Sequence, residues 1–316
     1  MPRILKLVNL NFIDADDFKP FEVNDYSFLP IEQRQKISLF SNRSHSVNAK
    51  VIIPPNQPNS VLRKGGKKGK RSGSERLIKL LDDMLIIVSI LIGRNVVQWS
   101  DRAYSIFPAV SSKHCNMISK NSTSLKNDLD TAINTLLLPD WQTKFENGFH
   151  VLMFYNCADL FVDESRFISN VKIWEFLYAH DIKDLDDSVE AHYYKLRKTK
   201  LETKICHLLR RYLLNNKNLS LDKLDIFIHL RNQLTHYGKL PVIVPDAPDW
   251  IRSLGWSGCK WYLRLFERLT QLLVLKTLGI DGIQSLNLFN VSEHLSELVS
   301  KGRISFYEKM DKAEIT

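Results

Sequence analysis

The sequence predicts an α+β protein in which a β-rich N-terminal module is followed by an all-α helical bundle. Three observations favour this class. Residues 1 to about 60 contain short runs of mixed apolar and polar residues separated by turn-forming residues. From residue 145 onward, apolar residues recur at three- and four-residue steps. Of the 316 residues, 44% are hydrophobic, so the chain can bury a substantial core in one large domain or two modest ones.

The N-terminal module is expected to span residues 1–104. Its strands are short and are predicted at residues 4–13, 21–23, 36–40 and 50–53. A loop rich in Pro, Gly, Ser, Lys and Arg follows at residues 56–74. Ser74 can then cap a closing helix, whose apolar residues continue until Gly93 stops it.

A helical connector is expected over residues 105–144, with a short helix from Leu125 to Leu137 that Pro139 ends. The remaining residues, 145–316, are expected to form the helical domain. Its main helices are predicted at residues 149–160, 167–178, 188–212, 221–238 and 261–279. On the first of them the helical spacing selects one face, made of Phe149, Leu152, Met153, Asn156, Cys157 and Leu160.

Composition narrows the class of protein. The cysteines Cys115, Cys157, Cys206 and Cys259 are widely separated and form no CxxC pair, which favours a reduced, cytoplasmic setting. We expect no secretory signal, because the N-terminal segment has acidic residues where a cleavage site would lie and lacks an adequate apolar core. We expect no membrane span, because the most apolar run, from Met84 to Ile92, is far shorter than the roughly 20 residues that a span requires. The sequence also lacks Walker A, GxGxxG and GxSxG motifs, which leaves nucleotide hydrolysis, Rossmann cofactors and α/β-hydrolase chemistry without support.

The net charge of +9 is concentrated in the loop at residues 56–74. Its six basic residues are Arg63, Lys64, Lys67, Lys68, Lys70 and Arg71. Such a loop can neutralise RNA phosphates without reading sequence. The alternative is that it is only a solvated linker.

The segment Asp225–Pro241 carries the candidate catalytic residues. Its apolar residues have the spacing of an amphipathic helix that Gly238 ends. Arg231 falls in the apolar stripe, where an unpaired guanidinium is costly. Asn232 and His236 stand at i and i+4, close enough for the amide to orient the imidazole.

This RN-x3-H pattern, followed by Tyr237 and Gly238, resembles the motif of HEPN domains, in particular the Apea-type branch of HEPN ribonucleases. The resemblance implies a cytoplasmic, homodimeric endoribonuclease that acts in antiviral defence or as a toxin and uses no metal or cofactor. Arg231, Asn232 and His236 would be catalytic, and Tyr237 and Lys239 would join the basic loop in binding RNA. The motif helix would pair two protomers, so that the second supplies the other histidine.

Two other interpretations of these residues are open. His236 can be a residue that interacts only with the C-terminal end of the helix dipole. Arg231 can pair with a structural acid on a neighbouring helix, such as Glu175, Asp159 or Glu190. In that case the domain would be a non-catalytic module for RNA binding or protein interaction.

Overall fold

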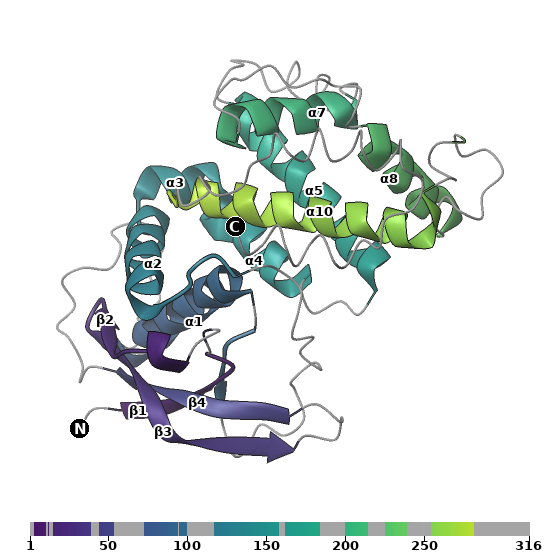
Figure 1. The fold of residues 1–316 in the computed structure, drawn as a ribbon. Coiled ribbons are helices and arrows are strands. Elements are labelled where there is room, and N and C mark those ends of the chain that lie inside the picture. The colour runs from purple at the N-terminus through teal and green to yellow at the C-terminus, as the bar shows by residue number, and fades with distance from the viewer. Residues whose placement is uncertain are drawn as a thin grey trace. The chain divides into compact units, whose positions relative to one another are not determined.

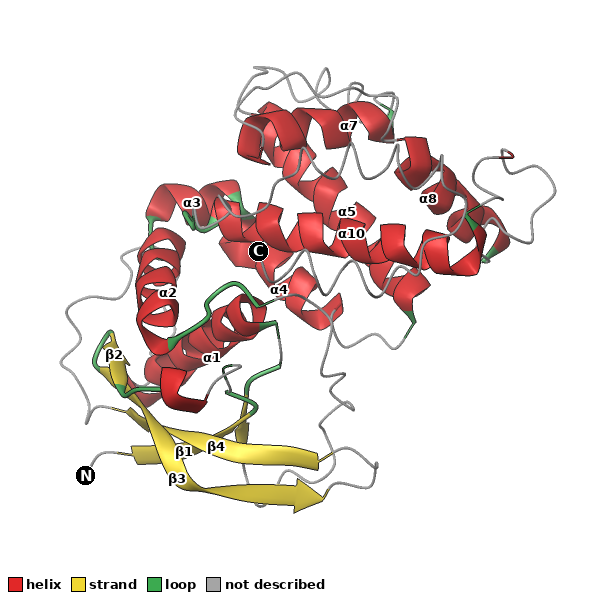
Figure 2. Cartoon of the chain, in the orientation of Figure 1, coloured by secondary structure: helices red, strands yellow, loops and turns green. Residues whose placement is uncertain are grey.

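The computed structural model describes residues 3–10, 12, 15–38, 44–53, 73–93, 95–99, 117–157, 162–183, 200–213, 225–238, 249 and 254–280. The chain divides into two compact units, Met1–Leu138 and Pro139–Thr316. The helix that we expected within a connector, Leu125 to Leu137, therefore belongs to the first unit. Strands occur only in the first unit among the described residues, and the described part of the second is helical (Figure 2).

The first unit contains a five-stranded sheet in the order β2-β3-β4-β1-β5. All four neighbouring pairs are antiparallel. The strands are β1 Arg3–Val8, β2 Phe21–Val23, β3 Tyr26–Ser38, β4 Ser44–Ile53 and β5 Val97–Trp99, with a short 3-10 helix, η1, at Ala15–Asp17. An antiparallel sheet combined with mostly helical structure confirms the α+β class.

Strand β3 is longer than the sequence predicts, because it begins at Tyr26 and not near Lys36. Pro30 and the charged residues after it interrupt the alternation of apolar and polar residues from which a strand is predicted. β2 pairs with β3 only over Tyr26–Phe28, so Pro30 lies beyond that pairing. The β3–β4 register also shifts between Pro30 and Gln35. A strand accepts proline at such an edge or irregularity. Strand β5 was not predicted at all.

One face of the sheet is covered by α1 Gly73–Ile92, and α2 Ser122–Leu136 packs beside α1 (Figure 1). Side chains alternate along β1, where Leu5 and Leu7 are buried and Ile4 is exposed. Phe21 and Phe28 face each other across β2 and β3, with stacked rings 4.9 Å apart. The predicted closing helix, Ser74 to Gly93, is thus confirmed and forms one wall of this core.

The start of α2 is fixed by a capping box. The Asn121 side chain accepts a hydrogen bond from the Ser124 amide at 2.9 Å, and the Asn121 amide donates to the Ser124 hydroxyl at 3.2 Å. We therefore expect Asn121→Ala to lower the free energy of unfolding by about 1 kcal/mol. Asn121→Asp keeps an acceptor oxygen and is expected to lose less. Urea denaturation followed by circular dichroism measures both, and equal losses would show that the side-chain acceptor is unimportant.

The second unit is built from helices of very different length. They are α3 Pro139–Lys144, η2 Glu146–Gly148, α4 Phe149–Cys157, α5 Asp163–Lys183, α7 Leu201–Leu208, η3 Leu209–Leu213, α8 Asp225–Tyr237 and α10 Gly255–Thr277. Of these, η2 is a 3-10 helix and η3 is a π-helix. Residues 184–199 and the tail after 280 lie outside the described residues, so the predicted beginning of the 188–212 helix does as well.

Helix α10 lies at the centre of this unit, with α5 and α8 beside it (Figure 1). Phe266 of α10 contacts the rings of Phe167 and Trp174 from α5 and of Phe227 from α8. Glu267 of α10 is buried and pairs with Arg166 at 3.5 Å. Aromatic packing and a buried ion pair thus join α5 to α10, and the ring of Phe227 joins α8 to it.

The buried face of α4 differs from the predicted one. Phe149 and Leu152 are exposed, whereas His150, Val151 and Phe154 are buried. Of the predicted face, Cys157 is buried as expected. The apolar spacing otherwise selected the wrong side because it excludes histidine, and His150 is held in the core by a hydrogen bond to Thr277 at 2.7 Å.

Candidate functional site

The motif helix α8 is anchored by its apolar face. Ile226, Phe227, Leu230 and Leu234 are buried, and α8 packs against α5, α7 and α10. The Phe227 ring lies 4.9 Å from that of Phe266 and 6.3 Å from that of Tyr262. These contacts fix which side of α8 faces the core and which side is available to a ligand.

Arg231 is half-buried at the border of that face. Its Nη1 donates a hydrogen bond of 2.9 Å to Oδ1 of Asn232, the next residue of the motif. We expected this amide beside the imidazole of His236, and in the structure it holds the guanidinium. Asn232 thus positions the arginine and not the histidine.

His236 and Tyr237 are exposed at the end of α8, with their rings edge to face at 6.5 Å. Gly238 follows with a φ of +64°, and its amide donates to the carbonyl of Leu234 at 3.1 Å. This left-handed residue closes the helix, as the sequence predicts. Regular helical geometry separates Arg231 from His236 by about 140° around the axis and roughly 7.5 Å along it.

Of the three acids considered as structural partners of Arg231, only Glu175 is among the described residues. Glu175 accepts a hydrogen bond from Lys204 at 3.2 Å. Asp159 and Glu190 lie outside the described residues, as do Lys239 and residues 54–72 with the six basic side chains of the predicted RNA-binding loop. Of the predicted site residues, the structure therefore places Arg231, Asn232, His236 and Tyr237 on one short stretch of α8.

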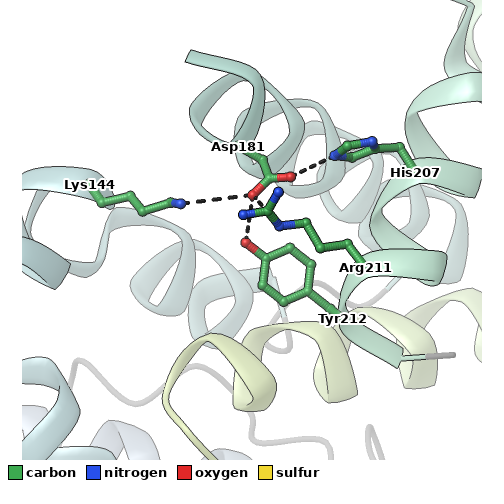
Figure 3. Close-up of polar contacts among 5 residues, drawn as sticks. All are labelled: Lys144, Asp181, His207, Arg211 and Tyr212. Carbon is green, nitrogen blue, oxygen red and sulfur yellow. Dashed lines mark hydrogen bonds and ion pairs between the residues drawn. The ribbon is translucent and has the colours of Figure 1, made fainter. Parts of the chain in front are cut away.

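A second polar cluster was not predicted from the sequence. The carboxylate of Asp181, which is fully buried near the end of α5, is surrounded by four side chains (Figure 3). Oδ2 lies 2.6 Å from Nε2 of His207, and Oδ1 accepts from the hydroxyl of Tyr212 at 2.9 Å. Arg211 Nε lies 3.0 Å from Oδ1, and Lys144 Nζ lies 3.8 Å from the same atom.

The environment of Asp181 stabilises its charged form. Burial alone would raise the pKa of this carboxyl, but the hydrogen bonds from His207 and Tyr212 and the charge of Arg211 outweigh it, so the pKa lies below its usual value. Burial and the adjacent carboxylate raise the pKa of the Tyr212 phenol. The tyrosine therefore keeps its proton and donates it in the hydrogen bond to Asp181.

The π-helix η3 brings Arg211 and Tyr212 to the same carboxylate as His207 of α7. In a π turn, the residues bonded along the backbone are five positions apart instead of four, and such turns are rare and frequent at functional sites. An α-helical periodicity would place His207 and Tyr212 on different faces, so the sequence pattern did not reveal the cluster. The signal that could have found it is the run of His, Arg and Tyr beside a helix containing an aspartate.

Three further features of the described residues limit the possible functional sites. No group of three or more His, Cys, Asp or Glu side chains among them could hold a metal ion. No helix within those ranges is long and apolar enough to cross a bilayer. The cysteines Cys157, Cys206 and Cys259 are buried as free thiols.

Comparison with known proteins identifies no relative: no protein-family model, no curated protein and no solved structure matches the chain. The chain's own residues and their geometry are therefore the basis for assigning a function.

Proposed function

We propose that this chain is a metal-independent endoribonuclease of the HEPN type, whose active site is shared by two protomers. The observation that supports the proposal most directly is the state of Arg231. This arginine is half-buried on α8, and the hydrogen bond described for it goes to the motif residue Asn232 and not to an acid. Its positive charge is thus positioned by a neutral partner and stays available to a phosphate.

The exposed imidazole of His236 would be the general base. A histidine can take the proton of a ribose 2′-hydroxyl as that oxygen attacks the adjacent phosphorus. Arg231 then stabilises the extra negative charge of the pentacoordinate phosphorane. The 5′-oxygen leaves with a proton from a second histidine, and the products are a 2′,3′-cyclic phosphate and a 5′-hydroxyl end.

The second histidine comes from another copy of the chain, because the RN-x3-H motif of each copy carries one histidine, His236. A two-fold axis beside the exposed end of α8 would bring both copies of His236 to one phosphate. Tyr237, which is 54% exposed, would then offer a ring on which a base can stack. Lys239 and the basic loop at residues 56–74 would bind the RNA backbone. Such an enzyme fits a cytoplasmic protein of antiviral defence or a growth-arresting toxin.

The test is cleavage of total cellular RNA by the full chain in the presence of EDTA. We expect His236→Ala and Arg231→Gln each to lower the cleavage rate by at least about 100-fold, because each removes a group that acts in the transition state. The matched controls are Thr235→Ala, an exposed position on the same turn, and Arg264→Gln, which removes an exposed arginine from α10. Wild-type-like cleavage by both motif variants would refute the proposal.

A non-catalytic RNA-binding HEPN domain is the second candidate. It is favoured by the engagement of Asn232 with Arg231, because the structure describes no polar partner that orients the imidazole of His236. The same preparation distinguishes the two functions. A binding domain retains labelled RNA, loses affinity in Arg231→Gln, and leaves the RNA intact at every protein concentration at which dimers form.

A further inference from the structure

The Asp181 cluster contains more positive than negative charge. Among the described side chains of the cluster, one carboxylate is opposed by the permanent cations Lys144 and Arg211, and His207 forms a hydrogen bond to it. The side chain of Asp181 is 0% exposed, whereas those of Lys144, His207 and Arg211 are 26%, 30% and 43% exposed. The negative charge is therefore buried, and the excess positive charge lies at the surface above it.

Arg211 has two described polar partners: its Nε faces Asp181, and its side chain also forms a hydrogen bond with the Tyr212 hydroxyl. A guanidinium has five N–H donors in a planar fork, so these two partners leave donors with which arginine can bind a carboxylate or phosphate. The guanidinium also lies over the ring of Tyr212, 5.9 Å from its centroid. In Figure 3 it lies between Lys144 on one side and His207 on the other. Two contacts thus fix the orientation of the fork before any ligand arrives.

His207 is oriented in the same way. Its Nε2 is held by Asp181, and the edge of its ring meets Tyr178 at 5.3 Å. When the ring is protonated, Nδ1 carries the second N–H. Asp181 therefore fixes the orientation of both Arg211 and His207, whose side chains are partly exposed, and the nearby ammonium of Lys144 adds charge.

We propose that this cluster is a phosphate-binding site, with Arg211 as the bidentate donor and with His207 and Lys144 as charged neighbours. Phosphate suits it because it carries up to two negative charges and accepts several hydrogen bonds at once. The phosphate belongs either to an RNA backbone or to a free nucleotide. No residue of α8 takes part, so this inference does not depend on the proposed ribonuclease activity.

The experiment measures binding of inorganic phosphate, adenosine monophosphate and a short labelled single-stranded RNA to the full chain. All three are tested in an Arg231→Gln background, so that α8 does not contribute. We expect Arg211→Gln to weaken binding by at least about tenfold, since it removes charge-assisted hydrogen bonds to the phosphate. Arg264→Gln, with the same change in net charge at an exposed site, is expected to bind like its parent.

Two more variants separate binding from folding. Tyr212→Phe removes a hydrogen bond to Asp181 and no ligand donor, so we expect a less stable protein that still binds phosphate. Arg211→Lys keeps the charge but loses the fork, and we expect it to stay folded and bind more weakly. Much tighter binding of RNA than of the nucleotide would identify the RNA backbone as the source of the phosphate, and similar affinities would identify a nucleotide. The proposal fails if none of the three probes binds, or if Arg211→Gln and Arg264→Gln bind equally well.

Discussion

Trp174→Ala is expected to lower the free energy of unfolding of the second unit by about 3–5 kcal/mol, which is the range for removing a large buried aromatic side chain. Trp174 is 0% exposed. Its indole stacks on the ring of Phe266 at 5.3 Å and donates a hydrogen bond of 2.8 Å to Thr270 Oγ1. The substitution leaves a cavity between α5 and α10 and removes the donor to a buried hydroxyl. Urea denaturation followed by the helical circular dichroism signal measures the loss.

Trp256→Ala is the matched control. Trp256 also lies on α10, but it is 47% exposed, and its described interaction is with the Lys260 ammonium 4.8 Å from the ring centroid. Such an exposed cation–π contact contributes about 0.5–1 kcal/mol. We expect the two tryptophan substitutions to differ by at least about 2 kcal/mol. A loss of equal size would mean that Trp174 does not fill the core as described.

His150 is expected to make the stability of the second unit fall as the pH decreases below about 6.5. Its Nε2 lies 2.7 Å from the Thr277 hydroxyl, which itself donates to the Val274 carbonyl. The imidazole must therefore donate through Nε2. Burial, with a smaller contribution from nearby His180, lowers the pKa of His150 to about 3.

The sign of the pH effect follows from this lowered pKa. Between the two pKa values the unfolded chain binds a proton at this position and the folded chain does not, so acid favours unfolding. Relative to His150→Leu, the wild-type protein is expected to lose about 1.4 kcal/mol for each pH unit between pH 6.5 and pH 3. His236→Leu, at an exposed histidine, is the control and is expected to run parallel to wild type. A constant difference between wild type and His150→Leu would contradict the prediction.

Helices with a one-sided apolar stripe and clear end signals could be predicted from the sequence. Gly93, Gly238 and Gly279 all have positive φ, and each follows the end of a helix that was expected there. Strands were harder to predict because their length depends on which other strands pair with them. The local sequence does not show this pairing. β3 continues through Pro30 because β4 provides a partner on one side, and β5 exists because β1 does.

The candidate site could be predicted in part for the same reason. Arg231, Asn232, His236 and Tyr237 belong to one helix, so helical geometry alone places them together. The partner of Asn232 could not be predicted, because Arg231 and His236 are both within its reach. The Asp181 cluster was not predicted, because its residues come from four separate elements, α3, α5, α7 and η3. It also depends on a π turn, which no residue pattern predicts.

The central position of α10 has a consequence for how the second unit opens. This helix contacts α4, α5, α8 and η3, and its residues from Leu269 to Leu275 are all buried. Any fluctuation that exposes its amide hydrogens to solvent must separate several of these neighbours together. Hydrogen exchange along this stretch would therefore report the rupture of the whole unit, whereas the exposed last turn of α8 could fray and re-form without disturbing it.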